Sequence, residues 1–317
     1  MKQKVINSVN PQGQSSYPSL IDVIGKTPLV EVPLNLVCPT LAKLEYLNPG
    51  GSVKDRSALF MIQEAEQNGW LKPGGTIIDA SSGNQGIALA IIGAQKGYKV
   101  IITISEKISI EKKKTLLAYG ATIVTCPVTD RIDDPEGYHS KAVEIHKNTP
   151  NSFMPNQYFN LSNPKAHETM LAPEIWQQTN GMITHFFAAA GTGGTISGVG
   201  TYLKKMNPTI KVIAVDSCNS YRSTNGHPKR YNLEGIGVDF ISPVLDVSVI
   251  DQFITVSDQE AFTALQSVAK KGFLVGPSSG AVAAAVKKYT KKLAPHDILV
   301  MIFGDSGRAY LSKDFYQ

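Results

Sequence analysis

The chain has 317 residues, of which 42% are hydrophobic and 18% are charged, as is typical of a globular protein large enough for two domains. Its net charge of +5 comes from scattered lysine clusters such as 112–114. We interpret them as solvated helix faces and expect no nucleic-acid partner, because no aromatic residues interleave with them. The three cysteines lie far apart and the six histidines lack metal-ligand spacing, so neither a disulfide framework nor a metal site is expected. No apolar run is long enough to span a membrane and the N-terminus lacks the apolar region of a signal peptide, which indicates a cytoplasmic protein without membrane contact.

Apolar segments alternate with helical patterns along the chain. Residues 1–18 are polar and predict a loose arm. In chain order, we expect strands at residues 41–44, 76–80, 100–104, 121–125, 185–190, 212–216 and 298–303. We expect helices at residues 87–96, 110–119, 196–206, 258–271 and 280–292, while Pro, Asp and Asn interrupt the alternation over 126–165. This pattern predicts an α/β fold with parallel sheets covered by helices on both faces.

The segment 48–56, Asn-Pro-Gly-Gly-Ser-Val-Lys-Asp-Arg, places a lysine after a glycine turn and at the expected start of a helix. Ser52 and Asp55 have the spacing of a capping box, with Ser52 as the N-cap. The positive end of the helix dipole disfavours the charged form of Lys54. A lysine whose neutral amine is favoured can form Schiff bases with carbonyl compounds. The alternative is a surface lysine that opens an amphipathic helix.

Two strand-to-helix junctions carry small and hydroxyl residues. Residues 79–86, Asp-Ala-Ser-Ser-Gly-Asn-Gln-Gly, suit a bound carboxylate, with helix capping as the structural alternative. Residues 188–195, Ala-Ala-Ala-Gly-Thr-Gly-Gly-Thr, suit a phosphate group. A dinucleotide site is the competing interpretation, because Gly191-x-Gly193 follows a strand and Asp216 ends the next strand. That fingerprint fails at its third glycine, where the chain has Ile196.

Two later loops complete the set. Residues 275–281 open the last expected helix with hydroxyls that suit a ring nitrogen or a helix cap, and residues 304–308 follow the last expected strand. A phosphate loop, a carboxylate loop and a neutralisable lysine together suggest pyridoxal phosphate as the cofactor. The loop 188–195 would hold its phosphate, Lys54 its aldehyde, and the loop 79–86 the carboxylate of an amino acid.

With these motifs in place, the chain resembles the fold-type II pyridoxal-phosphate enzymes of the cysteine synthase and cystathionine β-synthase group, from about Ile21 onward. The resemblance rests on residues 43–56, 82–84, 191–195 and 276–281, which occur in the family order. It implies two open, twisted, mostly parallel sheets flanked by helices, as in the tryptophan synthase β-like fold, with the active site between two domains. The expected parts are an arm (1–18), a larger cofactor-phosphate domain (19–52 and 160–317) and a smaller substrate-loop domain (53–159). Relatives of this type also imply a homodimer.

The resemblance implies roles for individual residues. Lys54 would be the catalytic Schiff-base lysine and proton carrier, and Ser278 would hydrogen-bond the ring nitrogen. The other cofactor-binding residues would be Asn84, at the 3′-oxygen, and Gly191, Thr192, Gly193, Gly194 and Thr195, at the phosphate. The residues expected to bind the amino-acid substrate are Ser81, Ser82, Gly83, Gln85 and Gln157. A neutral hydroxyl partner leaves the ring unprotonated, which favours β-replacement over transamination.

The implied reaction is β-replacement on L-serine or an O-activated L-serine, through an aminoacrylate intermediate and with a thiol nucleophile. Segments such as 134–136 and 234–240 resemble cystathionine β-synthase and favour homocysteine as the acceptor. The alternative is a cysteine synthase that uses O-acetylserine or O-phosphoserine and sulfide. An amine nucleophile that gives a 2,3-diaminopropionate derivative, and a catalytically weak ligand-sensing relative, are further alternatives.

Several positions depart from the family pattern. Gln85 replaces a short hydroxyl residue in the substrate loop, and Ser105 and Gly304 stand where prolines are common, so the amino-acid substrate stays open. Arg222 and Arg230 lie in a segment expected at the site entrance. We hypothesise that one of them recognises an acidic group on the leaving group or the nucleophile, with solvated loop arginines as the alternative.

Overall fold

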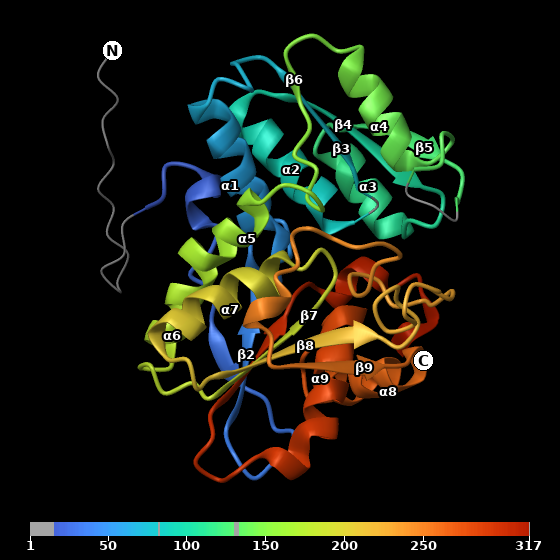
Figure 1. Ribbon diagram of the computed structural model, residues 1–317. Coiled ribbons are helices and arrows are strands. Elements are labelled where there is room, and N and C mark those ends of the chain that lie inside the picture. Colours follow the sequence, from blue (N-terminus) through green and yellow to red (C-terminus); the bar gives the residue numbers. More distant parts are fainter. Residues whose placement is uncertain (1–15, 82, 130–132, 317) are drawn as a thin grey trace.

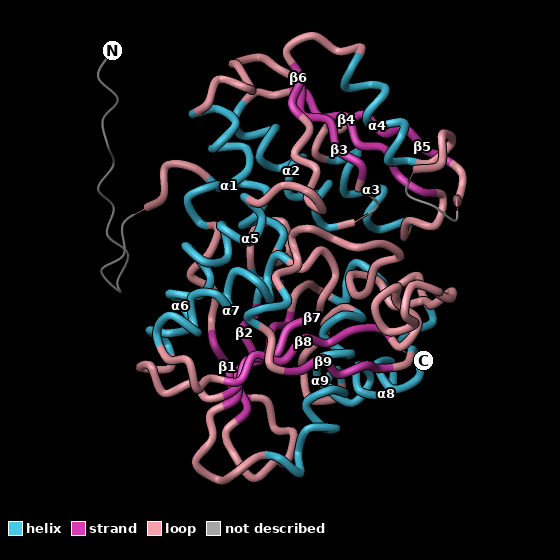
Figure 2. The backbone as a smooth tube through the Cα atoms, viewed as in Figure 1, coloured by secondary structure: helices cyan, strands magenta, loops and turns pink. Residues whose placement is uncertain are grey.

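The computed structural model describes residues 16–81, 83–129 and 133–316, and its strands form two sheets (Figures 1 and 2). In spatial order, the larger sheet contains β1 (Leu29–Glu31), β2 (Thr40–Leu44), β10 (Leu299–Phe303), β7 (His185–Ala189), β8 (Lys211–Ser217) and β9 (Gln252–Val256). The smaller sheet contains β5 (Thr122–Cys126), β4 (Lys99–Ser105), β3 (Thr76–Ala80) and β6 (Ser152–Phe153). Within the described ranges, β1 and β2 are antiparallel and every other strand pair is parallel. The predicted α/β fold with two mostly parallel sheets is confirmed.

Helices connect the strands. The α-helices are α1 (Lys54–Gln67), α2 (Asn84–Lys96), α3 (Ile110–Ala118), α4 (Tyr138–Lys147), α5 (Ser162–Ala166), α6 (Ala172–Gln178), α7 (Gly194–Met206), α8 (Asp258–Ala269) and α9 (Pro277–Tyr289). A π-helix, His167–Leu171, joins α5 to α6. Short 3-10 helices lie at Leu20–Val23, Glu45–Leu47, Val247–Val249, Thr290–Lys292, Gly307–Tyr310 and Asp314–Tyr316. In the part of the chain that the structure describes, no helix has the length and apolar character needed to cross a membrane.

Helices cover both faces of the larger sheet, and side chains along each strand alternate between the two faces. Phe186 and Val212 point into a core formed with α6 and α7, and Phe187 and Ile213 point into a core formed with α8 and α9. The smaller sheet packs against α1, α2 and α3 on one face and against α4 on the other. Both sheets therefore carry the continuous apolar strands that the sequence showed.

Differences from the expected elements are concentrated at helix starts. Helices α2, α7 and α9 begin two or three residues before the expected positions, because their first turns consist of Gly, Ser, Thr, Asn and Pro rather than apolar residues. Strands β1, β6 and β9 and helices α4, α5 and α6 were not expected. Helix α4 buries Ala142 as its only fully covered position in the described structure, which leaves a weak apolar pattern.

The predicted capping box at the start of α1 is wrong. Val53, not Ser52, precedes the helix, and it offers no side-chain cap. Ser52 instead forms a β-bridge with Asp305 while its hydroxyl accepts a hydrogen bond from the Lys54 N–H at 3.2 Å. Asp55 accepts a hydrogen bond from the Gly50 N–H at 2.5 Å, so its carboxylate folds back onto the glycine turn.

The two sheets draw their strands from different parts of the chain. The larger sheet combines strands β1 and β2 with strands β7, β8, β9 and β10. The segment between β2 and β7 supplies strands β3, β4, β5 and β6 of the smaller sheet. Helix α5 lies between the sheets in Figure 1, and α1 lies beside α2 and the smaller sheet. We retain the three-part division at 1–18, 19–52 with 160–317, and 53–159 as a proposal; residues 1–15 lie outside the described part of the chain.

Candidate active site

The N-termini of several helices and the carboxyl ends of several strands surround Lys54. Two adjoining cavities, of about 60 and 220 Å³, share Lys54, Asn84, Gly191, Thr192 and Gly235. Further residues of the smaller cavity include Gly193, Thr195, Ser278 and Asp305, and further residues of the larger one include Ser81, Gly83, Gln85 and Gln157. The structure therefore brings together all the described candidate residues except Gly194, which packs against the Asn163 side chain and lines neither cavity. Ser82, also expected to bind substrate, lies outside the described residues.

The amine of Lys54 sits in a setting that favours its neutral form. Burial lowers the pKa of Lys54 to about 8, and the nearby Asp305 carboxylate opposes that shift. Lys54 is the first residue of α1, where the helix dipole acts in the same direction as burial. Burial is the main cause, although the sequence pointed only to the dipole. Half-buried Lys54 lines both cavities, so its amine is accessible from each.

Asp305 connects Asn84 to the end of β10. Its carboxylate is 3% exposed, and its Oδ2 atom accepts hydrogen bonds from Asn84 Nδ2 at 2.8 Å and from the Tyr310 hydroxyl at 2.5 Å. Burial raises the pKa of Asp305, while Lys112, Tyr310 and Asn84 act against that rise. A Cβ at Gly276 would lie 2.1 Å from Asp305 Oδ1, so only glycine leaves room for this carboxylate. The sequence identified the loop 304–308 but assigned Asp305 no role.

The loop between β7 and α7 depends on glycine. Gly193 has a φ of +93°, and a Cβ there would lie 2.6 Å from Leu245 Cβ. A Cβ at Gly191 would lie 2.7 Å from the Gly235 carbonyl oxygen. Asn163 Nδ2 donates to the Thr192 hydroxyl at 3.1 Å and so fixes the loop from α5. Gly193 and Thr195 at the start of α7 line the small cavity, and the N–H groups of a helix start suit an anion.

A buried histidine lies behind this loop. His167 Nε2 is 3.3 Å from the Thr195 hydroxyl, and His167 begins the π-helix. Burial, with Lys54 and Arg56 nearby, holds the pKa of His167 well below its ordinary value. His167 is therefore a neutral partner of Thr195 and adds no positive charge to the loop.

The substrate loop presents buried polar groups to the larger cavity. Ser81 Oγ accepts hydrogen bonds from the Gly83 and Gly86 N–H groups at 3.3 and 3.1 Å. Gln85 Oε1 accepts from the Ser57 hydroxyl at 3.4 Å. Gln85 Nε2 and Gln157 Oε1 are buried without a hydrogen-bond partner among the described residues. Such groups are costly unless a ligand or water satisfies them, so they mark a binding surface.

Lys112 corrects the expectation of a solvated helix face. It is 2% exposed, its Nζ lies 2.7 Å from Glu234 Oε2, and it stands 4.0 Å from the centre of the Tyr310 ring. The lysines at 112–114 look alike in sequence, but one face of α3 turns toward the larger cavity. Lys112 and Glu234 therefore form a charged wall of the site that the sequence did not reveal.

The remaining departures and arginines fall elsewhere. Gly304 donates its N–H to Ser279 Oγ at 3.0 Å, a contact that a proline would lack. Ser105 is the last residue of β4. Arg230 lines a cavity of about 500 Å³ that shares Tyr138 and Tyr158 with the larger Lys54 cavity. Among the described lining residues of the two Lys54 cavities, neither Arg222 nor Arg230 occurs.

The residues around the smaller cavity fit pyridoxal phosphate. The loop 191–195 and the start of α7 suit the phosphate, and the lowered pKa of Lys54 suits an aldehyde. The Ser278 hydroxyl borders the same cavity and makes no hydrogen bond with any residue of the described ranges, so it is available to a ring nitrogen. Over residues 16–81, 83–129 and 133–316, no cluster of three or more His, Cys, Asp or Glu side chains is arranged to hold a metal ion.

Known proteins support this assignment. The family model described as pyridoxal-phosphate dependent enzyme matches residues 20–305. A cystathionine beta-synthase of Apis mellifera is 45% identical over 93% of this chain and 61% of its own length. A probable cysteine synthase of Bacillus subtilis is 42% identical over 93% of this chain and 96% of its own length. The chain thus spans about three-fifths of the first protein (61%) and nearly all of the second (96%).

Solved structures give the same result for the fold. The O-acetylserine dependent cystathionine beta-synthase of Helicobacter pylori has a TM-score of 0.90 and 38% identity, covering 96% of this chain and 100% of that one. A structure of O-ureido-L-serine synthase has a TM-score of 0.89 and 33% identity, covering 95% of each chain. These similarities confirm the predicted family and cofactor, and they support β-replacement as the class of reaction. The chain belongs to the fold-type II pyridoxal-phosphate dependent enzymes.

Proposed function

We propose that this enzyme catalyses β-replacement on L-serine or an O-activated L-serine, with a thiol as the nucleophile and homocysteine as the preferred acceptor. The observation that carries the proposal is the position of Lys54, whose pKa is lowered to about 8 by burial. It lies between the loop 191–195, suited to a phosphate, and the unsatisfied amide groups of Gln85 and Gln157. When bound, pyridoxal phosphate supplies the electron sink that weakens the Cα–H bond of an amino acid. The relatives named cystathionine beta-synthase favour homocysteine.

Residues around the smaller cavity hold the cofactor in this proposal. The loop from Gly191 to Thr195 binds its phosphate through backbone N–H groups and hydroxyls, with Gly194 supporting the loop by donating its N–H to the Thr192 hydroxyl at 3.2 Å. Asn84 uses its second Nδ2 proton for the 3′-oxygen, because the first is donated to Asp305. The hydroxyl of Ser278 donates to the ring nitrogen. Lys54 carries the proton between its Nζ and the substrate Cα, which its lowered pKa permits near neutral pH.

Residues around the larger cavity orient the amino acid. Ser81, Ser82 and Gly83, together with the first N–H groups of α2, form the site for the substrate carboxylate. Gln85 Nε2 supplies a further donor, and Gln157 Oε1 accepts from the substrate ammonium; both atoms lack a partner among the described residues. This arrangement turns the Cα–H bond toward Lys54, since Lys54 lines the same cavity.

A cysteine synthase that uses sulfide is the second candidate. It is favoured by coverage: the chain spans 96% of the Bacillus subtilis probable cysteine synthase and 98% of the Staphylococcus aureus cysteine synthase. An amine nucleophile or a ligand-sensing role has no comparable support. The cytoplasmic location and the homodimer stay predictions.

The test combines a spectrum with a substrate grid. Purified protein should absorb in the visible range with pyridoxal phosphate, and Lys54→Ala should lose that band, while Lys112→Met should keep it. L-serine, O-acetyl-L-serine and O-phospho-L-serine are then each combined with homocysteine or sulfide, and products are identified by mass spectrometry. Cystathionine as the main product supports the proposal. Cysteine with little cystathionine supports the alternative, and a protein that stays colourless with added pyridoxal phosphate refutes both.

A further inference from the structure

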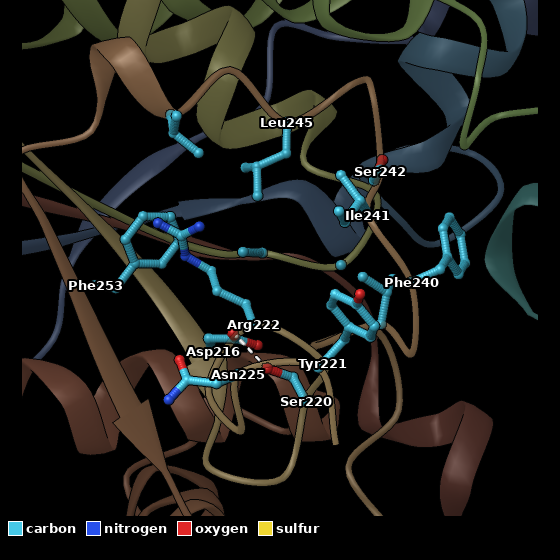
Figure 3. A pocket seen from close by; sticks show the side chains of 15 residues that line it. Asp216, Ser220, Tyr221, Arg222, Asn225, Phe240, Ile241, Ser242, Leu245 and Phe253 are labelled. Carbon is cyan, nitrogen blue, oxygen red and sulfur yellow. Dashed lines mark hydrogen bonds between the residues drawn. The ribbon is translucent and has the colours of Figure 1, made fainter. Parts of the chain in front are cut away.

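A separate cavity of about 330 Å³ lies at the carboxyl ends of β7 and β8 in the larger sheet and is bordered by Phe253 near the start of β9 (Figure 3). Segments 220–226 and 238–247 enclose it, and it shares only Gly191 with the described lining of the two Lys54 cavities. Open α/β sheets bind ligands beyond the carboxyl ends of their strands, and the volume is sufficient for a small molecule. Nothing in the proposed reaction uses this cavity.

Arg222 is the only cationic side chain among the described lining residues of the cavity. Its guanidinium lies 3.7 Å from the centre of the Phe253 ring, and Figure 3 shows the side chain extended along one side of the cavity toward that ring. Stacking fixes the plane of the guanidinium without using its N–H groups. Arg222 makes no hydrogen bond with any residue that the structure describes, so its planar set of donors is available to a ligand.

The nearby carboxylate is already engaged. Asp216 is 3% exposed and accepts hydrogen bonds from the Ser217 N–H at 2.8 Å, the Ser220 hydroxyl at 2.6 Å and the Ser223 hydroxyl at 3.1 Å. A ribose diol or a ligand ammonium would compete with these donors. The dinucleotide interpretation of Gly191-x-Gly193 and Asp216 fails here for that reason.

Much of the remaining wall is apolar. Figure 3 shows Leu245, Ile241, Phe240 and Phe253 around the cavity. Ile241 is 76% exposed and Val247 at the rim is 50% exposed. Apolar side chains that gather at the rim of a cavity favour a ligand with an apolar body.

We propose that this cavity binds an amphipathic carboxylate, with the carboxylate on the Arg222 guanidinium and an apolar body against Phe240, Leu245 and Phe253. The planar fork of arginine matches a carboxylate in a two-point contact, and such charge-assisted bonds are stronger than neutral ones. The proposal does not depend on the proposed reaction, because none of these residues lines the Lys54 cavities in the described structure.

The cavity wall is also the support of the phosphate loop. The Ser242 hydroxyl donates to the Thr192 carbonyl oxygen at 2.7 Å, and Leu245 packs against Gly193 so closely that a Cβ there would lie 2.6 Å from Leu245 Cβ. A ligand against Leu245 restrains the segment that holds this loop. Binding is therefore expected to tighten the cofactor, and by linkage the cofactor tightens the ligand by the same factor.

The test uses the holoenzyme with hydrocinnamate as the probe and hydrocinnamyl alcohol as its neutral match, titrated by calorimetry. We expect hydrocinnamate to bind about tenfold or more tightly than the alcohol, because a charge-assisted contact is lost in the alcohol. Arg222→Gln should abolish that preference while the alcohol still binds, which shows that the cavity remains folded. Arg230→Gln, which removes the same charge from the same segment, should leave hydrocinnamate binding unchanged.

Three outcomes would overturn the proposal. Equal binding of acid and alcohol excludes the carboxylate contact, and equal effects of Arg222→Gln and Arg230→Gln exclude a specific role for Arg222. Loss of hydrocinnamate binding in Ser81→Ala places the probe in the substrate loop instead. The coupling has its own readout: release of pyridoxal phosphate should slow when hydrocinnamate is present in the wild type and not in Arg222→Gln.

Discussion

Replacement of Arg56 tests how the chain fixes the position of Lys54. Arg56 is two residues after Lys54 and is fully buried, and its guanidinium contacts Glu45 at 2.7 and 2.9 Å and Glu174 at 2.7 and 2.8 Å. Glu174 keeps a second partner in Lys43 at 2.7 Å, whereas Glu45 is fully buried and forms no second direct ion pair among the described residues. Arg56→Met therefore strands one buried carboxylate, and breaking a buried pair in this way costs about 3–5 kcal/mol.

The assay is urea unfolding of the cofactor-free protein at neutral pH, with the free energy of unfolding taken from the midpoint and slope. We expect Arg56→Met to lower it by about 3–5 kcal/mol. Arg56→Met combined with Glu45→Gln should recover part of the loss, because the amide carries no charge. A loss below about 1 kcal/mol, the range of exposed pairs, or a double variant no more stable than Arg56→Met, would refute the reasoning.

The same network predicts an acid dependence. Burial raises the pKa of Glu174, but hydrogen bonds and attraction from Arg56 and Lys43 outweigh it and lower the pKa to about 2. A carboxylate with a lowered native pKa stabilises the fold above its unfolded pKa, and that stability is lost as the pH falls through the native value. The wild type should therefore lose stability between about pH 4.5 and pH 2 more steeply than Arg56→Met does.

Three further predictions concern the site. Asp305→Asn should weaken pyridoxal phosphate binding about tenfold by removing a charge-assisted bond to Asn84. In an Asn84→Ala background the same change should have little effect. An equal effect in both backgrounds would mean that Asp305 does not act through Asn84. Burial raises the pKa of Asp79 to about 7, so the native state holds a proton that the unfolded state has lost. The free energy of unfolding should therefore fall as the pH rises from about 4 to 7. The urea midpoint should change less with pH in Asp79→Asn than in the wild type, and an unchanged dependence would contradict this. Gly193→Ala should weaken cofactor binding, measured by equilibrium dialysis, because φ is +93° and the added Cβ meets Leu245. Adding Leu245→Ala should restore only part of the affinity. Full recovery would show that the backbone angle is unimportant.

Local motifs predicted the site because each one sits where a strand ends or a helix begins. Lys54, Asn84 and the loop 191–195 carry their own turn chemistry, so their approximate placement follows from nearby residues. Contacts between distant segments were not predictable in this way. Asn84 and Asp305 are 221 positions apart, and Lys112 and Glu234 are 122 apart. Only the folded arrangement of the two sheets brings them together.

Helix starts were missed for a related reason. Apolar periodicity begins at the first residue that packs into the core, but the first turns of α2, α7 and α9 face the cavities instead. The residues in those turns are small or polar because they leave backbone N–H groups open to a ligand. The error at the helix starts therefore coincides with the residues that bind.

Contacts of the residues on each side of Lys54 in the chain fix its position. The Arg56 ion pairs anchor α1 to Glu45 and Glu174, while Val53 donates its N–H to the Gly304 carbonyl oxygen at 2.8 Å, next to Asp305. Burial lowers the pKa of Lys54 to about 8, and Asp305 keeps it from falling further. A proton carrier must both take up and release a proton near the working pH. Asp305 therefore does two things in our proposal: it orients Asn84, and it keeps the amine of Lys54 within reach of protonation.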